Sequence, residues 1–171
     1  YGGALALLAD APERFDAFVA MDAPYASYVG RRGSPISPPS MRPFLDYARR
    51  AASGDVMMAV SHSRIRAPEY PAARETMSAI LRALGVERRK AARVVEARRT
   101  KPVVVAFGGP PPQLKQISLA EAGGLWVAAF EGRDADAHVA HLTHAPRLVW
   151  KRLADRWSAE TVAERAKTPR S

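Results

Sequence analysis

Three histidines stand at three-residue steps late in the chain: His138, His141 and His144. Imidazole nitrogens bind metal ions and also transfer protons near neutral pH, so spacing decides between these chemistries. Helical zinc pairs stand four residues apart, with a glutamate beside the first histidine. The three-residue steps do not match that pattern, even with Asp134 or Asp136 as a further ligand. We therefore predict no metal site, and no cofactor.

A second polar group, Ser61-His62-Ser63, follows an apolar run and is expected at the tip of a strand. Strand tips are where the sites of α/β proteins lie. Adjacent residues of a strand point to opposite faces of its sheet, so His62 is badly placed to serve either serine. These residues are expected to line a pocket or to cap the next segment.

The composition is that of one globular domain. The chain has 171 residues, of which 47% are hydrophobic and 25% are charged, and it has no cysteine. Disulfides, thiolate metal sites and a cysteine nucleophile are thereby excluded. No apolar run approaches the roughly 20 residues that a membrane helix needs, so no membrane partner is expected. We predict a single domain over residues 1–157 and a basic, flexible tail over 158–171.

Apolar runs that alternate with helical patterns predict an α/β fold with a mostly parallel sheet and flanking helices. The expected strands are 15–21, 56–60, 103–107 and 125–130. Helices are expected over 3–11, 44–52, 72–84 and about 138–157, the last with Pro146 inside it. Residues 30–43, rich in glycine, proline and serine, predict a long surface loop.

The net charge of +9 raises nucleic acid as a partner. Basic residues are densest from Arg88 to Lys101, and this run contains no aromatic residue on which a base could stack. We interpret it as a solvated helix and loop, which leaves nucleic acid as the less favoured partner.

The first residues resemble a known family. Tyr1-Gly2-Gly3-Ala4-Leu5-Ala6-Leu7 is similar to the sequence that follows the serine in the Gly-x-Ser-x-Gly nucleophile elbow of α/β-hydrolases. Residues 15–24, 57–63 and 124–142 resemble, in order, the later strands of that fold and the loop that bears its histidine. The resemblance implies the C-terminal part of an α/β-hydrolase-like three-layer sandwich, beginning just after the serine.

That resemblance implies acyl transfer, in which a serine attacks an ester or amide carbonyl and a histidine accepts its proton. His138, in a loop after the terminal strand, is the first choice for the base, with His141 and His144 as alternatives. Asp22, directly after the first strand, is preferred as the orienting carboxylate, and Glu69 is the alternative.

The resemblance also implies that the backbone N–H of Tyr1 would donate to the oxyanion, because Tyr1 would follow the nucleophile. Tyr25, His62 and His141 are candidates for lining the pocket.

Two functions follow from these features. The first is a serine hydrolase of the esterase class that takes a small-molecule ester or amide and is inactive as this chain alone, since the nucleophile is absent. The alternative is a non-catalytic α/β domain that binds nucleic acid or another polyanion through its basic surface. The sequence leaves the oligomeric state and the compartment open, with the cytoplasm slightly favoured.

Overall fold

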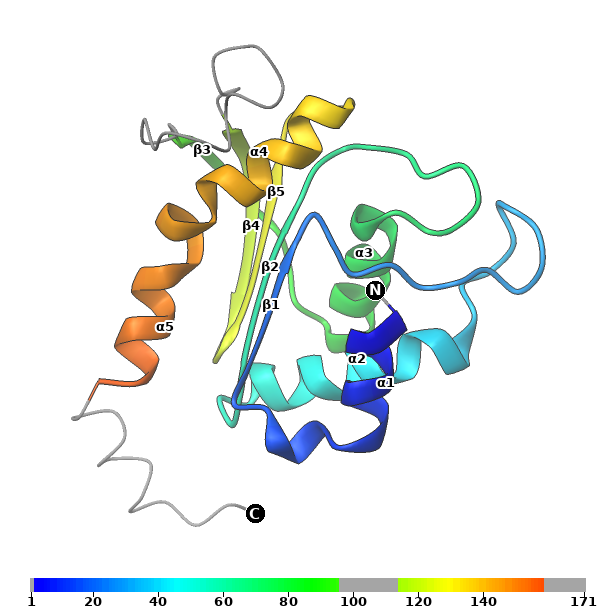
Figure 1. Cartoon of the computed structure of the whole chain (residues 1–171), viewed down its shortest axis with the longest axis horizontal. Coiled ribbons are helices and arrows are strands. Elements are labelled where there is room, and N and C mark those ends of the chain that lie inside the picture. Colours follow the sequence, from blue (N-terminus) through cyan, green and yellow to red (C-terminus); the bar gives the residue numbers. More distant parts are fainter. Residues whose placement is uncertain (1, 96–113, 159–171) are drawn as a thin grey trace.

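The computed structural model describes residues 2–95 and 114–158, and it has an α/β fold (Figure 1). The strands are β1 (Ala17–Met21), β2 (Met57–His62), β3 (Arg89–Val95), β4 (Leu114–Ala122) and β5 (Leu125–Phe130). The helices are α1 (Gly2–Asp10), α2 (Pro38–Ala52), α3 (Ala73–Leu84), α4 (Ala135–Ala145) and α5 (Lys151–Arg156), with a 3-10 turn η1 (Pro12–Arg14) and a π-helical turn η3 (Pro146–Trp150).

The five described strands form one mixed sheet in the order β1-β2-β5-β4-β3. Strands β1, β2 and β5 pair in parallel, while β4 is antiparallel to both of its neighbours. Four of these strands therefore run in the same direction. The carboxyl ends of β1, β2 and β5 consequently meet at one edge of the sheet, although the three strands are far apart in the chain.

Helices cover both faces of the sheet: α1, α2 and α3 lie on one face, and α4 and α5 on the other (Figure 1). All six residues of β2 and all six of β5 are buried. Alternate side chains enter opposite cores, so that Met58 and Val60 pack with α2 and α3, whereas Met57 and Ala59 pack with α4 and α5. This two-sided burial explains why both strands are continuously apolar in sequence.

The tight turn between β4 and β5 packs against the end of α2. The Gly124 N–H donates to the carbonyl oxygen of Ala51 over 2.7 Å. A Cβ atom at Gly124 would collide with the carbonyl oxygen of Val56. Gly123, in the same turn, has a positive φ of 52°. Both glycines are therefore needed for this close contact between layers.

The sequence-based prediction of a loop over 30–43 was wrong at its end, because α2 begins at Pro38. Proline is well suited to the first turn of a helix, where its missing N–H would have no partner within the helix. The segment Ser37-Pro38-Pro39 is thus a helix start within a proline-rich stretch.

The basic run from Arg88 to Lys101 was also misinterpreted, because Arg89–Val95 forms strand β3 and not a solvated helix and loop. This strand pairs only with β4 among the described strands, and most of its side chains are exposed. Charged side chains are common on strands at the edge of a sheet, where they discourage pairing with other chains. Residues 96–101 lie outside the described part.

Strand β4 was not predicted at all, and the strand expected at 103–107 lies outside the described residues, as do residues 159–171 of the expected tail. The remaining predicted strands and the helix over 72–84 agree closely with β1, β2, β5 and α3. Within the described ranges, no helix is both long and apolar enough to cross a membrane.

Candidate functional site

Asp22 lies directly after β1, at the edge where the carboxyl ends of the parallel strands meet. Its N–H donates to the carbonyl oxygen of Ser61 over 2.8 Å, which ties it to the end of β2. Its backbone has a positive φ of 50°, a conformation that aspartate tolerates better than most residues. Its side chain is only 4% exposed. A carboxylate this deeply buried requires hydrogen-bond donors around it.

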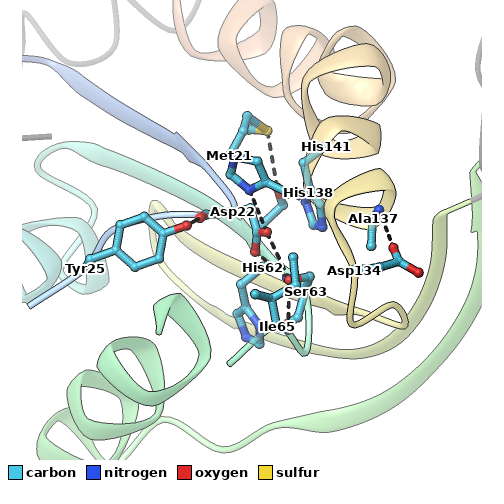
Figure 2. Close-up of polar contacts among 11 residues, drawn as sticks. Met21, Asp22, Tyr25, His62, Ser63, Ile65, Asp134, Ala137, His138 and His141 are labelled. Carbon is cyan, nitrogen blue, oxygen red and sulfur yellow. Dashed lines mark hydrogen bonds and ion pairs between the residues drawn. The ribbon is translucent and has the colours of Figure 1, made fainter. Parts of the chain in front are cut away.

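Three donors surround the Asp22 carboxylate (Figure 2). The Ser63 N–H donates to Oδ1 over 2.7 Å, and the Ser63 hydroxyl donates to Oδ2 over 2.9 Å. The third is His138, whose Nδ1 lies 2.9 Å from Oδ2. Residues that follow β1, β2 and β5 thus meet at a single carboxylate.

The start of α4 positions His138. Asp134 precedes this helix, and its Oδ1 accepts a hydrogen bond from the Ala137 N–H over 2.9 Å, as a helix cap does. The loop before it is fixed to the loop after β2, because the Arg64 N–H donates to the carbonyl oxygen of Gly132 over 2.9 Å. The expectation that His138 lies in a loop was therefore wrong: α4 begins at Ala135.

The contact with Asp22 selects the state of the His138 ring. Because the carboxylate can only accept, Nδ1 carries the proton that is shared with it. The neutral ring then has its lone pair on Nε2, on the far side of the imidazole. The His138 side chain is 45% exposed, so this nitrogen belongs to a ring that solvent reaches. A buried carboxylate that holds the Nδ1–H of a half-exposed histidine is the arrangement of an acid–base pair.

His141 is placed differently from His138, one turn further along α4. Its ring is fully buried, and its Nδ1 lies 2.7 Å from the Ser61 hydroxyl. Burial lowers the pKa of His141 to about 4, so the ring is neutral at pH 7. Ser61 is fully buried as well. This serine–histidine contact is therefore sealed in the core, where an ester or amide cannot reach it.

His62 points away from both neighbouring hydroxyls, in line with strand alternation. Its Nδ1–H donates to the carbonyl oxygen of Ser63 over 3.0 Å, and its Nε2 accepts from Arg88 Nη1 over 3.1 Å. Burial lowers the pKa of His62 to about 4. A neutral histidine thus accepts a hydrogen bond from a guanidinium, which a protonated ring could not do.

Of the other predicted site residues, Tyr25 lies close to the pair, and its hydroxyl donates to the backbone carbonyl oxygen of Asp22. Burial, with the nearby charge of Asp22, raises the pKa of Tyr25 to about 12. Glu69 is exposed in the loop before α3, and the structure does not bring it to His138. Tyr1, the expected oxyanion donor, lies outside the described residues.

His144 is buried, and its Nδ1–H donates to the carbonyl oxygen of Ala140. The three histidines of α4 therefore make three different sets of contacts. Among the described residues, no group of three or more histidine, aspartate or glutamate side chains could hold a metal ion.

Two residues of the site were missed by sequence reasoning. Ser63 was recognised as a strand-tip residue but not as the donor of two hydrogen bonds to Asp22. Arg88 was treated as part of a solvated run, yet it contacts buried His62. Ser63 follows Ser61 by two residues. Nothing else in the sequence indicates that Ser63 binds Asp22, which stands 41 residues earlier in the chain.

Comparison of the chain with protein-family models, with curated proteins and with solved structures finds no match.

Proposed function

We propose that this chain supplies the acid and the base of a Ser-His-acid hydrolase that cleaves a carboxylic ester or amide. The observation that carries the proposal is the 2.9 Å contact between Asp22 Oδ2 and His138 Nδ1. Asp22 would hold the imidazole in one orientation and tautomer, and His138 Nε2 would accept the proton of the nucleophilic serine. When the leaving group departs, the same nitrogen would return that proton to it.

On this proposal the nucleophilic serine would stand in a segment before Tyr1, as the resemblance to α/β-hydrolases implies. Helix α1 leads through η1 to the start of β1, so its N-terminal end is directed back toward the edge where β1 ends (Figure 1). Its nine residues span about 14 Å. A nucleophile just before α1 would therefore lie at the same edge as His138.

Neither serine at the tip of β2 suits the role of the nucleophile as well as a serine before α1 would. Ser61 is buried against His141, and the Ser63 hydroxyl donates its proton to the Asp22 carboxylate. A nucleophile must instead present its proton to the histidine. Both serines are better explained as groups that support the pair.

The test is labelling of the complete polypeptide with a fluorophosphonate, together with hydrolysis of p-nitrophenyl acetate. We expect His138→Gln to abolish labelling and to lower the rate of hydrolysis by about 10²–10⁴-fold, the range typical of general acid–base catalysis. Asp22→Asn is expected to lower it substantially, because the amide has one acceptor oxygen in place of two and cannot accept from all three donors.

Glu69→Gln is the matched control, since it neutralises the other candidate carboxylate without touching the pair. The proposal is wrong if the complete polypeptide takes up no label, or if His138→Gln is labelled and hydrolyses ester as fast as the wild type. It is also wrong in its choice of acid if Glu69→Gln lowers activity and Asp22→Asn does not.

A further inference from the structure

A cleft of about 600 Å³ opens beside the loop that follows β2, and five arginines line it. They come from three segments of the chain: Arg32 from the loop before α2, Arg64 and Arg66 from the loop after β2, and Arg74 and Arg82 from α3. Its volume lies in the range of small-molecule sites. Three separate segments thus present guanidinium groups to the same cleft.

None of these five guanidiniums has an ion-pair partner in the part of the chain that the structure describes. Some arginines elsewhere are paired, such as Arg50 with Asp55 at 2.7 Å. The single carboxylate that lines the cleft, Glu75, is otherwise engaged. Its Oε2 accepts from the Ala72 N–H over 2.9 Å and from the Tyr28 hydroxyl over 3.3 Å. The cleft therefore holds five guanidinium groups against one carboxylate, which leaves an excess of positive charge.

A further cation, Arg88, interacts electrostatically with Arg74 of the cleft. Arg88 is partly buried against His62, and its Nη2 has no hydrogen-bond partner among the described residues. Burial and the nearby charge of Arg74 lower the pKa of Arg88. Placing like charges so close together is unfavourable unless an anion offsets the repulsion.

A smaller cavity of about 250 Å³ at the opposite edge of the sheet provides a contrast. It is lined by Arg152 and Arg156, together with Glu121. There the charges pair with acids, since Arg152 contacts Glu121 at 2.8 Å and Arg156 contacts Asp16 at 3.0 Å. Acidic partners therefore neutralise both arginines of the smaller cavity, whereas none of the five arginines of the first cleft has such a partner among the described residues.

We propose that the arginine cleft binds a small polyanion that carries two or more closely spaced oxyanion groups, phosphates or carboxylates. The planar guanidinium matches both groups with paired N–H donors, which suits it to either. The lining described above has no aromatic side chain on which a nucleic-acid base could stack, so a small ligand fits better than a polynucleotide. This inference goes beyond the proposed hydrolysis and does not depend on it.

The test is isothermal titration of the 171-residue chain with inorganic tripolyphosphate and, separately, with citrate, at 150 mM salt. The variant is R74Q/R82Q, which removes two exposed charges of the cleft. The matched control is R42Q/R49Q, which removes two exposed charges of α2 that contact Asp46. Circular dichroism verifies that both variants are folded.

We expect saturable binding of at least one probe, with a Kd that rises about tenfold or more in R74Q/R82Q, since charge-assisted hydrogen bonds are lost. The control is expected to change the Kd less than about twofold, because its charges lie outside the cleft. The probe that binds more tightly identifies phosphate or carboxylate as the preferred group.

Three outcomes would overturn the inference. The first is that neither probe binds. The second is that both variants weaken binding equally, which would show unspecific attraction to a basic protein. The third is that a single-stranded oligonucleotide binds more tightly than either probe and loses affinity in R74Q/R82Q alone, which would make the cleft part of a nucleic-acid surface. Hydrolysis is not measured here, so failure of this test leaves the proposed function unaffected.

Discussion

At the scale of single residues, Asp22 is the centre of the site. Three donors from two other segments of the chain reach its carboxylate, and a fourth group, the Tyr25 hydroxyl, binds its carbonyl oxygen. Hydrogen bonds of this kind stabilise a buried charge and fix its geometry at the same time. The His138 ring gains its orientation from a carboxylate that is itself held in place.

The three buried histidines predict how stability depends on pH. Burial lowers the pKa of His62 and His141 to about 4 and also lowers the pKa of His144, whereas histidines of the unfolded chain titrate near 6.5. Between these values the unfolded state binds more protons than the folded state. The free energy of unfolding therefore has its full value above about pH 6.5. It falls as the pH drops toward 4, by up to about 1.4 kcal/mol per pH unit for each histidine.

Urea denaturation at pH 7, 6, 5 and 4.5 measures this dependence. His141→Asn, whose amide can still contact Ser61, should lose less stability over the same window than the wild type, because one of the three histidines with a lowered pKa is gone. An identical pH dependence in the variant and the wild type would contradict the assignment of the loss to His141.

At the scale of elements, the contact of α2 with the turn between β4 and β5 holds the layers together. The carbonyl oxygen of Ala51 accepts from Gly124 N–H, and the Gly124 carbonyl oxygen accepts from Met58 N–H over 3.0 Å. Through these two backbone hydrogen bonds, Gly124 connects the turn with the end of α2 and with the central strand β2. The absence of a side chain at position 124 allows this approach.

Gly124→Ala is expected to lower the free energy of unfolding by about 2 kcal/mol, because the new methyl group would displace the backbone at Val56. Gly3→Ala is the control: nothing lies within 4 Å of the position its Cβ would take in α1, and alanine should stabilise that helix by up to about 1 kcal/mol. Thermal denaturation monitored by circular dichroism distinguishes the two. Similar melting temperatures for both variants would contradict the packing described here.

Strands β2 and β5, which are buried on both faces, could be predicted from the sequence, whereas the neighbouring strands β4 and β3 could not. The runs at β2 and β5 are apolar throughout because helices cover both faces. Strand β4 interposes Lys115, Gln116 and Glu121 among apolar residues, and β3 is mostly basic. Their pairing is set by neighbours distant in sequence, so local apolarity gives little signal.

The same distinction applies to the site. Asp22 and His138 could be nominated because both follow apolar runs, and ends of parallel strands share an edge. Ser63 and Arg88 could not be assigned their contacts, because those depend on which strands are adjacent. The order β1-β2-β5 places Ser63 between the other two residues, and no local pattern of the chain specifies that order.

At the scale of the whole molecule, the residues of the candidate site lie together at one edge of the sheet. The carboxyl ends of β1, β2 and β5 bring together residues separated by as many as 116 positions. The loop after β2 contributes to both features of this edge: Ser63 supports the acid–base pair, and Arg64 lines the arginine cleft. The opposite edge carries the tight turn and paired charges, which serve packing.

The measurement that tests the central claim most directly is the tautomer of His138, read from long-range ¹H–¹⁵N correlations in the labelled 171-residue chain above pH 7. The account predicts a ring protonated at Nδ1, with the lone pair on Nε2, that changes its tautomer in Asp22→Asn and keeps it in Glu69→Gln. A ring protonated at Nε2 in the wild type, unchanged in Asp22→Asn, would show that Asp22 does not orient His138.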